Sequence, residues 1–526
     1  MNRALRVFSY GHGGLGVGLL ALAAGLLLLR ADRFRGRPEA LLPALYTLVG
    51  LAMITELCLT TVYLFSPAYI DHIEASVASG VHALLAGRPL YPPLDSYSFG
   101  GLLYGPLLAE LNSLGYVLFR DSIAAKLVGW LAGWSAVAVL ILQSRRGARA
   151  VASCAALSYA LCFLVSFGAD LTVDRSEPLL LLFAAGSMVI ALEFKGLGAA
   201  SVLGLLCGAA MGLKAHALLY IVPSVYVWGA GRTREEWGRR WKIMAACFCG
   251  AAATAVVLPF LPSNVCAEGF VRYLSLAAKH GLSLDLFARN GAFLLGLWAP
   301  IVLLNGGFRQ LSLAGRPWLG FALTLLGCEC VVLVVASKPG AGIHHFIPFL
   351  APHVWLFQDA CARSGSAVPG RAAVALSVAI LGMITPTAQT FGSFAAFDLQ
   401  LPAQRRQRDE LLGFATRYPG GMLGVADNTS YALSNYRPWL TARGVTQTDY
   451  GAFMDLELSG LSDEPLRAAF ARCTIPYVYL PKPGAPYEIT SNYRDRPLFS
   501  DALRREFAIR YSQTAAGIYF DVFTCR

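Results

Sequence analysis

The chain has 526 residues, of which 56% are hydrophobic and only 14% are charged, and its formal net charge is +11. Ordinary soluble domains carry about 25% charged residues, so this composition excludes a conventional soluble protein. Residues 390–526 hold 15 Lys/Arg and 14 Asp/Glu, a balance of +1, so the remaining +10 belongs to residues 1–389. That excess is mostly arginine in short loops, which is the pattern of the positive-inside rule and argues against a nucleic-acid patch.

Apolar blocks of about 17 to 25 residues, the length that crosses about 30 Å of hydrocarbon, recur along the chain and predict a polytopic α-helical membrane protein. The first block, 13–30, follows Arg3 and Arg6 and is not followed by a small-residue cleavage site, which favours a signal anchor. Arg-rich connectors, the clearest at 232–242, identify the cytoplasmic side. Thirteen blocks can be marked, the last at 372–390.

Counting sides from these connectors leaves one conflict near the beginning of the chain. The connector 30–37 and the segment 66–101 would both be cytoplasmic, although a single apolar block separates them. The short block 102–119 contains Pro106 and Glu110 and is therefore predicted not to cross the membrane. About 12 crossings then remain, and 66–101 becomes an external loop.

Two carboxylates, Asp71 and Glu74, stand at the start of this loop, directly after the apolar block 41–65. Ionisable groups at a membrane boundary usually face a cavity or a substrate path. Helical spacing over 71–86 predicts an interfacial helix that carries Asp71, Glu74 and His82 on its polar face. The alternative is a polar face that is only solvated.

Side counting also gathers titratable groups of both signs on the external face, which suggests an active site or a transport vestibule there. Lys214 ends a glycine-rich stretch and is either a cation for an anionic substrate group or a lysine that snorkels to the interface. The loop 337–345 holds glycines, one lysine and two histidines, and such a loop can wrap a phosphate or form a plain surface turn. The external groups are Asp71, His72, Glu74, His82, Asp170, Asp174, Arg175, Glu177, Lys214, His216, His280, Lys338, His344 and His345.

Residues 391–526 carry an ordinary charge density and predict a soluble α/β domain that is large enough for its own core. Its expected strands are 424–427 and 477–480, and its expected helices are 429–440, 463–472 and 500–507. Cys473 and Cys525 are its only cysteines, and they can form a disulfide if this domain lies in an oxidising compartment.

Taken in order, these motifs resemble those of the C-type glycosyltransferase superfamily (GT-C), which includes protein O-mannosyltransferases and aminoarabinose transferases. The resemblance covers about residues 41–390, which make up most of the expected membrane-embedded catalytic module 1–390. Glu74 departs from the usual pattern because the second carboxylate commonly follows the first directly. The matching elements are Asp71-His-Ile-Glu74, Gly87-Arg-Pro-Leu-Tyr91, Tyr104-Gly-Pro-Leu107, Asp174, Gly208–Lys214 and the loop from Lys338.

The resemblance implies an inverting hexosyl- or pentosyltransferase that takes sugar from a polyprenyl-phosphate carrier and passes it to a lipid, glycan or protein acceptor. It implies a bacterial inner-membrane protein whose active face and 391–526 domain are extracytoplasmic. Asp71 is the expected general base, and Glu74 is expected to support it. The expected groups around the donor phosphate and the sugar are Asp174, Arg175, Lys214, Lys338, His344, His345, Tyr91 and Tyr104, although the tyrosines can also belong to an interfacial aromatic belt.

Asp71 and Glu74 are also possible ligands for a divalent cation, since carboxylates suit Mg²⁺, Ca²⁺ or Mn²⁺. Three alternatives stay open from the sequence: a transporter or flippase for lipid-linked saccharides, a polymerase of such saccharides, and a scaffold that displays the C-terminal domain. The chain has no internal repeat of the kind that transporters show, and its external loop 262–289 is short for a polymerase.

Overall fold

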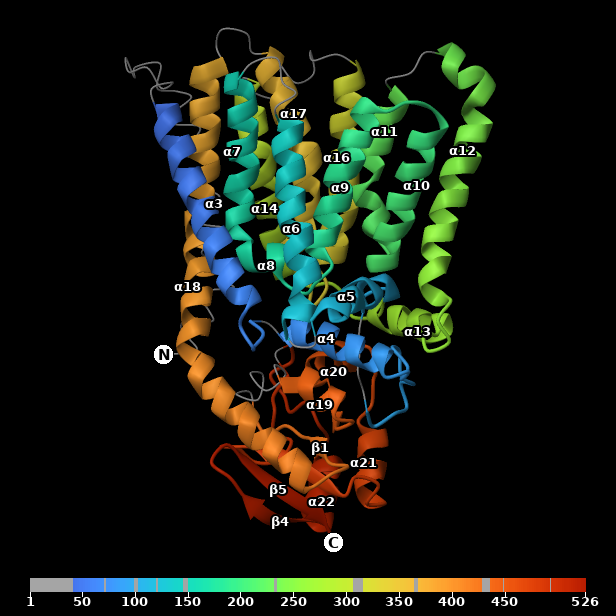
Figure 1. The fold of residues 1–526 in the computed structure, drawn as a ribbon, viewed down its shortest axis with the longest axis vertical. Coiled ribbons are helices and arrows are strands. Elements are labelled where there is room, and N and C mark those ends of the chain that lie inside the picture. Colours follow the sequence, from blue (N-terminus) through green and yellow to red (C-terminus); the bar gives the residue numbers. More distant parts are fainter. Residues whose placement is uncertain are drawn as a thin grey trace. The chain divides into compact units, whose positions relative to one another are not determined.

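Helices dominate the fold, as the apolar blocks predict. The computed structural model describes residues 41–70, 72–98, 103–119, 122–144, 150–230, 234–305, 316–363, 368–427, 436–447, 449–491 and 493–526. The predicted anchor at 13–30 and the residue Asp71 lie outside this described part. The chain divides into two compact units, each built from three separate stretches of sequence, and Figure 1 labels their elements.

The first unit comprises Met1–Leu64, Gly129–Val257 and Leu282–Phe394. Its long helices run alongside one another in Figure 1. Two helices, α6 (Ser122–Ser144) and α18 (Val368–Arg417), continue into the second unit. The other elements are α3 (Leu42–Leu64), α7 (Ala150–Ser166), α8 (Gly168–Thr172), α9 (Glu177–Glu193), α10 (Gly196–Leu213), η2 (Ala217–Tyr220), α11 (Val222–Ala230), α12 (Arg234–Val257), α14 (Leu284–Leu304), α16 (Arg316–Ala336), η4 (Ile343–Phe349) and α17 (Leu350–Arg363).

Seven helices in the described part of the chain are long and apolar enough to cross a membrane, and these indicate a multi-pass membrane protein. Other predicted crossings form shorter helices, such as the 17 residues of α9. The predicted number of about 12 crossings therefore stays a prediction. The seven candidate spans are Leu42–Leu64, Ile123–Ser144, Gly196–Leu213, Trp241–Phe260, Leu284–Leu304, Trp318–Ala336 and Pro369–Arg417.

The second unit comprises Phe65–Val128, Leu258–Gly281 and Ala395–Arg526. Its helix α5 (Pro106–Leu118) has 13 residues. At about 1.5 Å per residue this helix is about 20 Å long, which is short of the hydrocarbon thickness and in line with the prediction for 102–119. The other helices are α4 (His72–Leu85), η3 (Leu258–Phe260), α13 (Ala267–Ala277), α19 (Arg437–Ala442), α20 (Tyr450–Glu457), α21 (Glu464–Ala471) and α22 (Asp501–Arg510).

A five-stranded sheet in the order β2-β1-β3-β5-β4 forms the C-terminal end of the second unit. The first three strands in this order are parallel, and β5 pairs antiparallel with both β3 and β4. Leu411 and Phe414 of α18 pack with Leu423, Tyr479 and Val522 of the sheet, so this part has its own core. The strands are β1 (Met422–Leu423), β2 (Thr446–Gln447), β3 (Tyr477–Pro481), β4 (Tyr511–Ala516) and β5 (Phe520–Cys525).

The expected elements of this region are largely present. The strand at 477–480 and the helices at 463–472 and 500–507 are confirmed by β3, α21 and α22. The strand expected at 424–427 is wrong by two residues, because only Met422 and Leu423 pair with β2 and β3. Cys473 and Cys525 form the predicted disulfide. The predicted boundary at 390/391 lies inside the continuous helix α18, and the division into a membrane module and a soluble domain stays a prediction.

Candidate functional site

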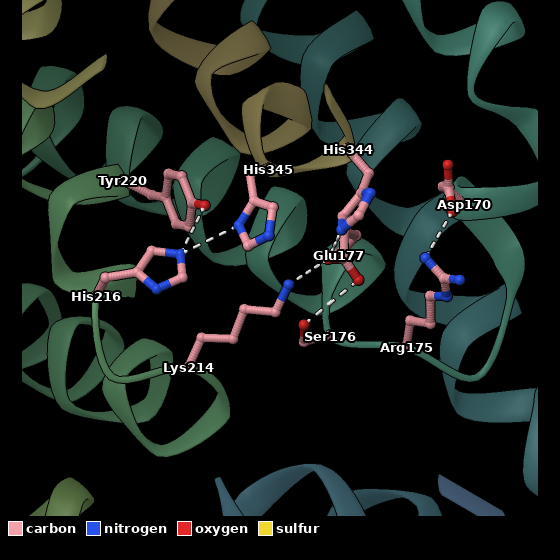
Figure 2. Close-up of polar contacts among 9 residues, drawn as sticks. All are labelled: Asp170, Arg175, Ser176, Glu177, Lys214, His216, Tyr220, His344 and His345. Carbon is pink, nitrogen blue, oxygen red and sulfur yellow. Dashed lines mark hydrogen bonds and ion pairs between the residues drawn. The ribbon is translucent and has the colours of Figure 1, made fainter. Parts of the chain in front are cut away.

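The first unit brings three segments together at one set of helix ends. Lys214 follows the end of α10, Glu177 begins α9, and His344 and His345 lie in η4, which follows α16. Figure 2 shows their side chains directed toward one another, and we call Glu177, Lys214, His216, His344 and His345 the Glu177 cluster. The Arg-rich connectors follow α11, α14 and α17, at the helix ends opposite those that adjoin the cluster.

Close packing between α10 and α12 fixes the position of Lys214. A Cβ atom at Gly204 would lie 2.2 Å from the carbonyl oxygen of Phe248, and one at Gly208 would lie 2.2 Å from that of Ala252. Only glycine allows two helix backbones to approach so closely. The glycine-rich sequence of α10 therefore seats this helix against α12 and places Lys214 at its C-terminal end.

Lys214 and Glu177 form a buried ion pair at the centre of the cluster. The Lys214 ammonium donates a hydrogen bond to Glu177 Oε1, and the two side chains are only 8% and 1% exposed. His344 Nε2 lies 3.7 Å from the same oxygen, and Ser176 Oγ donates to Glu177 Oε2 at 3.4 Å. Burial raises the pKa of Glu177, but Lys214, His344 and Arg175 outweigh burial and lower that pKa to about 2. The carboxylate is therefore ionised at neutral pH.

A chain of aromatic side chains extends the cluster. His345 Nδ1 lies 3.3 Å from His216 Nε2, and the Tyr220 hydroxyl lies 3.4 Å from the same nitrogen. Burial lowers the pKa of His344 and of His216 to about 3, and Lys214 adds to this effect. Burial and the same lysine hold the pKa of His345 well below its usual value. The three imidazoles are therefore neutral near pH 7, and each has one N–H to donate.

The other predicted phosphate-site residues also belong to the first unit. Arg175 forms an ion pair with Asp170, at 3.2 Å between Nη1 and Oδ1, and Asp174 is fully buried. The segment before Asp174 packs tightly on α6, where a Cβ at Gly129 would lie 2.2 Å from the carbonyl oxygen of Val173.

Lys338 begins the predicted glycine loop and is partly buried. Its carbonyl oxygen accepts a hydrogen bond from the Ala341 N–H at 3.0 Å, and Gly340 between them has a φ of +80° that favours glycine. The charge of Lys338 lies near enough to His216 to contribute to lowering the pKa of that imidazole, after burial and Lys214. The glycine loop contributes His344 and His345 to the Glu177 cluster, and the predicted role of Lys338 at a phosphate stays a prediction.

The Glu177 cluster and the neighbouring Arg175 suit an anionic ligand, which would contact cations that already pair with carboxylates. Lys214 already pairs with Glu177, and Arg175 already pairs with Asp170. A phosphate would therefore compete for these cations and would gain hydrogen bonds from the neutral imidazoles and from Lys338. Figure 2 shows the lysine, the imidazoles and the carboxylate converging on one another.

The predicted acidic motif belongs to the second unit, and its first carboxylate, Asp71, lies outside the described residues. Glu74 is fully buried, and its Oε2 accepts a hydrogen bond from the Ile70 N–H at 3.1 Å. A carboxylate in the first turn that accepts from a backbone N–H stabilises a helix start. The alternative of a polar face on α4 that is only solvated is wrong, because Glu74 and Ala78 of that face are both buried. Glu74 therefore has a structural task at the start of α4.

A buried lysine that the sequence did not single out holds the segment before Asp71. Lys126 is fully buried and donates hydrogen bonds to the carbonyl oxygens of Ser66 at 2.8 Å and Ala68 at 2.6 Å. Its ammonium also lies 5.3 Å from the centre of the Tyr69 ring. An ion in this environment needs such partners, because burial without them is costly.

The two predicted tyrosines are linked by a hydrogen bond. The Tyr91 hydroxyl donates to the carbonyl oxygen of Tyr104 at 2.8 Å, and the Tyr91 ring packs against Phe270 and Tyr273. Tyr91 is 3% exposed, so in this structure it is a core residue of the second unit. Its predicted contact with a sugar stays a prediction.

A third carboxyl group in the second unit, Glu110 of α5, was absent from the predicted site. Burial raises its pKa to about 7 although the residue remains partly exposed. Among the described residues, no group of three or more His, Cys, Asp or Glu side chains is arranged to hold a metal ion. Because Asp71 lies outside those residues, a divalent cation on Asp71 and Glu74 stays a prediction.

Glu177 is the main site residue that sequence reasoning missed. The sequence placed it on the external face but did not assign it to the site, and the same holds for His216 and Asp170. The available signal was a carboxylate directly before an apolar block, in the stretch Asp174-Arg-Ser-Glu-Pro178. Its partner Lys214 is 37 residues away, so the sequence could not show the pairing.

Comparison with known proteins gives a likeness in structure alone. No family model matches the chain, and no curated protein sequence matches it. ArnT from Cupriavidus metallidurans is an aminoarabinose transferase whose crystal structure contains undecaprenyl phosphate. That structure is similar to this chain with a TM-score of 0.54 and a sequence identity of 13%. The alignment covers 91% of this chain and 98% of the ArnT chain. The structure of ArnT in the apo state gives a TM-score of 0.52 at 12% sequence identity, over 91% of this chain and 97% of the ArnT chain. The chain therefore has the fold of the C-type (GT-C) membrane glycosyltransferases, as its motifs predict.

Proposed function

We propose that this protein is a membrane glycosyltransferase that moves a hexosyl or pentosyl group from a polyprenyl-phosphate carrier to an extracytoplasmic lipid, glycan or protein. The observation that carries the proposal is the Glu177 cluster, a buried set of cationic and N–H groups at one set of helix ends. It occurs in a fold shared with ArnT, whose structure was determined with undecaprenyl phosphate bound.

In this proposal the Glu177 cluster receives the phosphate of the carrier. Negative charge develops on the leaving phosphate oxygen as the bond to the sugar breaks, and fixed donors aimed at that oxygen lower the barrier. Lys214 supplies a charge, and His344 and His345 supply neutral N–H groups. Glu177 keeps Lys214 oriented when no donor is bound.

Asp71 is the proposed general base at the acceptor. The acceptor hydroxyl oxygen attacks the anomeric carbon, its proton passes to Asp71, and the bond between that carbon and the phosphate oxygen breaks on the opposite face. The carrier leaves as polyprenyl phosphate, and the configuration at the anomeric carbon inverts. Glu74 supports this step by stabilising the start of α4.

The proposed location is a bacterial inner membrane, with the Glu177 cluster and the region after residue 390 on the extracytoplasmic side. Two observations support this orientation. The Arg-rich connectors join the helix ends opposite the cluster, in line with the positive-inside rule. The disulfide between Cys473 and Cys525 suits an oxidising compartment.

The test is a transfer assay with the full chain in lipid nanodiscs and labelled polyprenyl-phosphate sugars. The wild type should form a glycosylated product and release polyprenyl phosphate in equal amounts. Asp71→Asn should lower the rate by about 10²-fold or more, as expected for loss of a general base. The matched control is Asp95→Asn, an exposed carboxylate in the same predicted loop, which should retain activity. Near-normal transfer by Asp71→Asn would remove Asp71 as base, and carrier movement across vesicles without product would favour a transporter.

A further inference from the structure

The C-terminal region of the second unit contacts helix α4, which directly follows Asp71 in the sequence. Arg437 of α19 forms an ion pair with Asp449, at 2.5 Å between Nη1 and Oδ2. The same guanidinium nitrogen donates to Ser76 Oγ of α4 at 2.7 Å, and Ser76 Oγ lies 2.8 Å from Asp449 Oδ2. The three side chains therefore form a closed triangle between α4 and the C-terminal region.

Each member of this triangle is buried. Arg437 is 4% exposed, Asp449 is 3% exposed and Ser76 is 8% exposed. Asp449 Oδ1 also accepts a hydrogen bond from the Ala452 N–H at 3.1 Å, which fixes the carboxylate at the start of α20. A buried ion pair is stable only when both partners are present, because removing one leaves an uncompensated charge. The triangle therefore favours a single arrangement of α4 against α19 and α20.

Further contacts on either side of the triangle reinforce this arrangement. Before α4, the Tyr69 ring packs against Trp439, with ring centres 5.7 Å apart. After α4, Arg88 Nη2 donates to the carbonyl oxygen of Thr441 at 2.6 Å. At the first residue of α4, a Cβ on Gly451 would lie 3.1 Å from His72 Cδ2, so glycine allows α20 to approach closely.

We propose that Arg437 is a positioning residue for glycosyl transfer, because with Asp449 and Ser76 it fixes the helix that begins next to Asp71. This inference rests on the proposed function for its catalytic consequence, whereas the contacts of Arg437, Asp449 and Ser76 do not depend on that function. The C-terminal region thus serves as the support of the acidic motif. Arg437 does not touch the donor in this account, so its loss should affect turnover and leave donor binding unchanged.

The test compares Arg437→Ala with Arg467→Ala, which breaks an exposed ion pair with Glu464 in the same region. Arg437→Ala should lower kcat at least tenfold while the Kd for undecaprenyl phosphate changes less than twofold. Hydrogen exchange of residues 72–85 should accelerate at least tenfold in this variant. Arg467→Ala should change none of these quantities.

Two further variants cover the case in which Arg437→Ala does not fold. Ser76→Ala removes only the neutral link and should raise exchange in 72–85 and lower kcat to a smaller extent. The double variant Arg437→Gln with Asp449→Asn removes both buried charges and should fold better than Arg437→Ala alone. Unchanged exchange of 72–85 in Ser76→Ala and in a folded Arg437 variant would overturn the proposal. If the wild type shows no transfer, the proposed function fails. The exchange measurement still decides whether Arg437, Asp449 and Ser76 stabilise α4.

Discussion

Lys214 and Glu177 form a buried ion pair that joins the end of α10 to the start of α9, 37 residues away in the sequence. The pair lies within a group of neutral histidines. Glu177 therefore fixes the orientation of the lysine in a low-dielectric environment. This ion pair should affect the stability of the protein and the dependence of that stability on pH.

Removing one partner of this pair should destabilise the protein strongly. Glu177→Gln leaves Lys214 buried without its counter-charge, and such a change costs about 3–5 kcal/mol of unfolding free energy. The double variant Glu177→Gln with Lys214→Met should recover much of that loss but should not bind phosphate. Thermal unfolding in detergent measures both effects. Glu268→Gln, which breaks an exposed pair with Arg272, should change stability by at most about 1 kcal/mol.

Acidification should destabilise the Glu177 cluster through His344. The folded pKa of His344 is about 3, so below an unfolded pKa of about 6.5 only the unfolded state takes up a proton. The free energy of unfolding should therefore fall by about 2 kcal/mol for this group between pH 7.5 and pH 5. Glu177 contributes little in this window, because its stabilising effect is lost only as the pH falls from its unfolded pKa of about 4.5 through its folded pKa of about 2. His216 and His345 act in the same direction, so His344→Gln should reduce the pH dependence of the melting temperature without abolishing it, and an unchanged slope would contradict this account.

The glycine contact between α10 and α12 predicts that glycine-to-alanine substitutions at two positions of α10 change stability in opposite directions. Gly208→Ala places a Cβ 2.2 Å from a backbone oxygen of α12 and should destabilise by about 1–3 kcal/mol. Gly198→Ala, near the start of the same helix, meets nothing within 4 Å and should stabilise by up to about 1 kcal/mol. Melting temperatures measure both. Equal shifts for the two variants would mean that the helices are not held in this contact.

The disulfide should stabilise the C-terminal sheet. Cys473 and Cys525 are 52 residues apart, and closing a loop of this length is worth roughly 4 kcal/mol by loop entropy. Cys473→Ser should therefore make residues after 417 more sensitive to protease. The matched control is Cys266→Ser, an exposed free cysteine, which should leave the digestion pattern unchanged.

The sequence was informative where chemistry and local spacing decide the outcome. The apolar blocks predicted the helices, and the ordered motifs predicted the GT-C fold. Lys214 and the loop from Lys338 were both expected at a phosphate site, which stays a prediction, and His344 of that loop lies in the Glu177 cluster together with Lys214. These features depend on composition and on periodicity within single segments.

Pairings between distant segments were not available from the sequence. Glu177 could be recognised as an external carboxylate, but its partner is fixed by how α9 and α10 pack. The burial of Glu74 was missed because the helical wheel of α4 cannot show which other segments pack against its polar face, where the Tyr116 hydroxyl lies 3.3 Å from His82 Nε2. Arg437 and Asp449 carry no local signal, since an arginine and an aspartate in a stretch of ordinary charge density are usually surface residues.

The Glu177 cluster is the proposed binding site for the phosphate of a polyprenyl-phosphate carrier. The most direct measurement is the affinity of the full chain for undecaprenyl phosphate in nanodiscs. Lys214→Ala, assayed at a temperature where it remains folded, should weaken binding at least tenfold. Lys195→Ala removes an exposed lysine at the other end of α10 and should bind as the wild type does. Equal affinities of the wild type and folded Lys214→Ala would contradict the account.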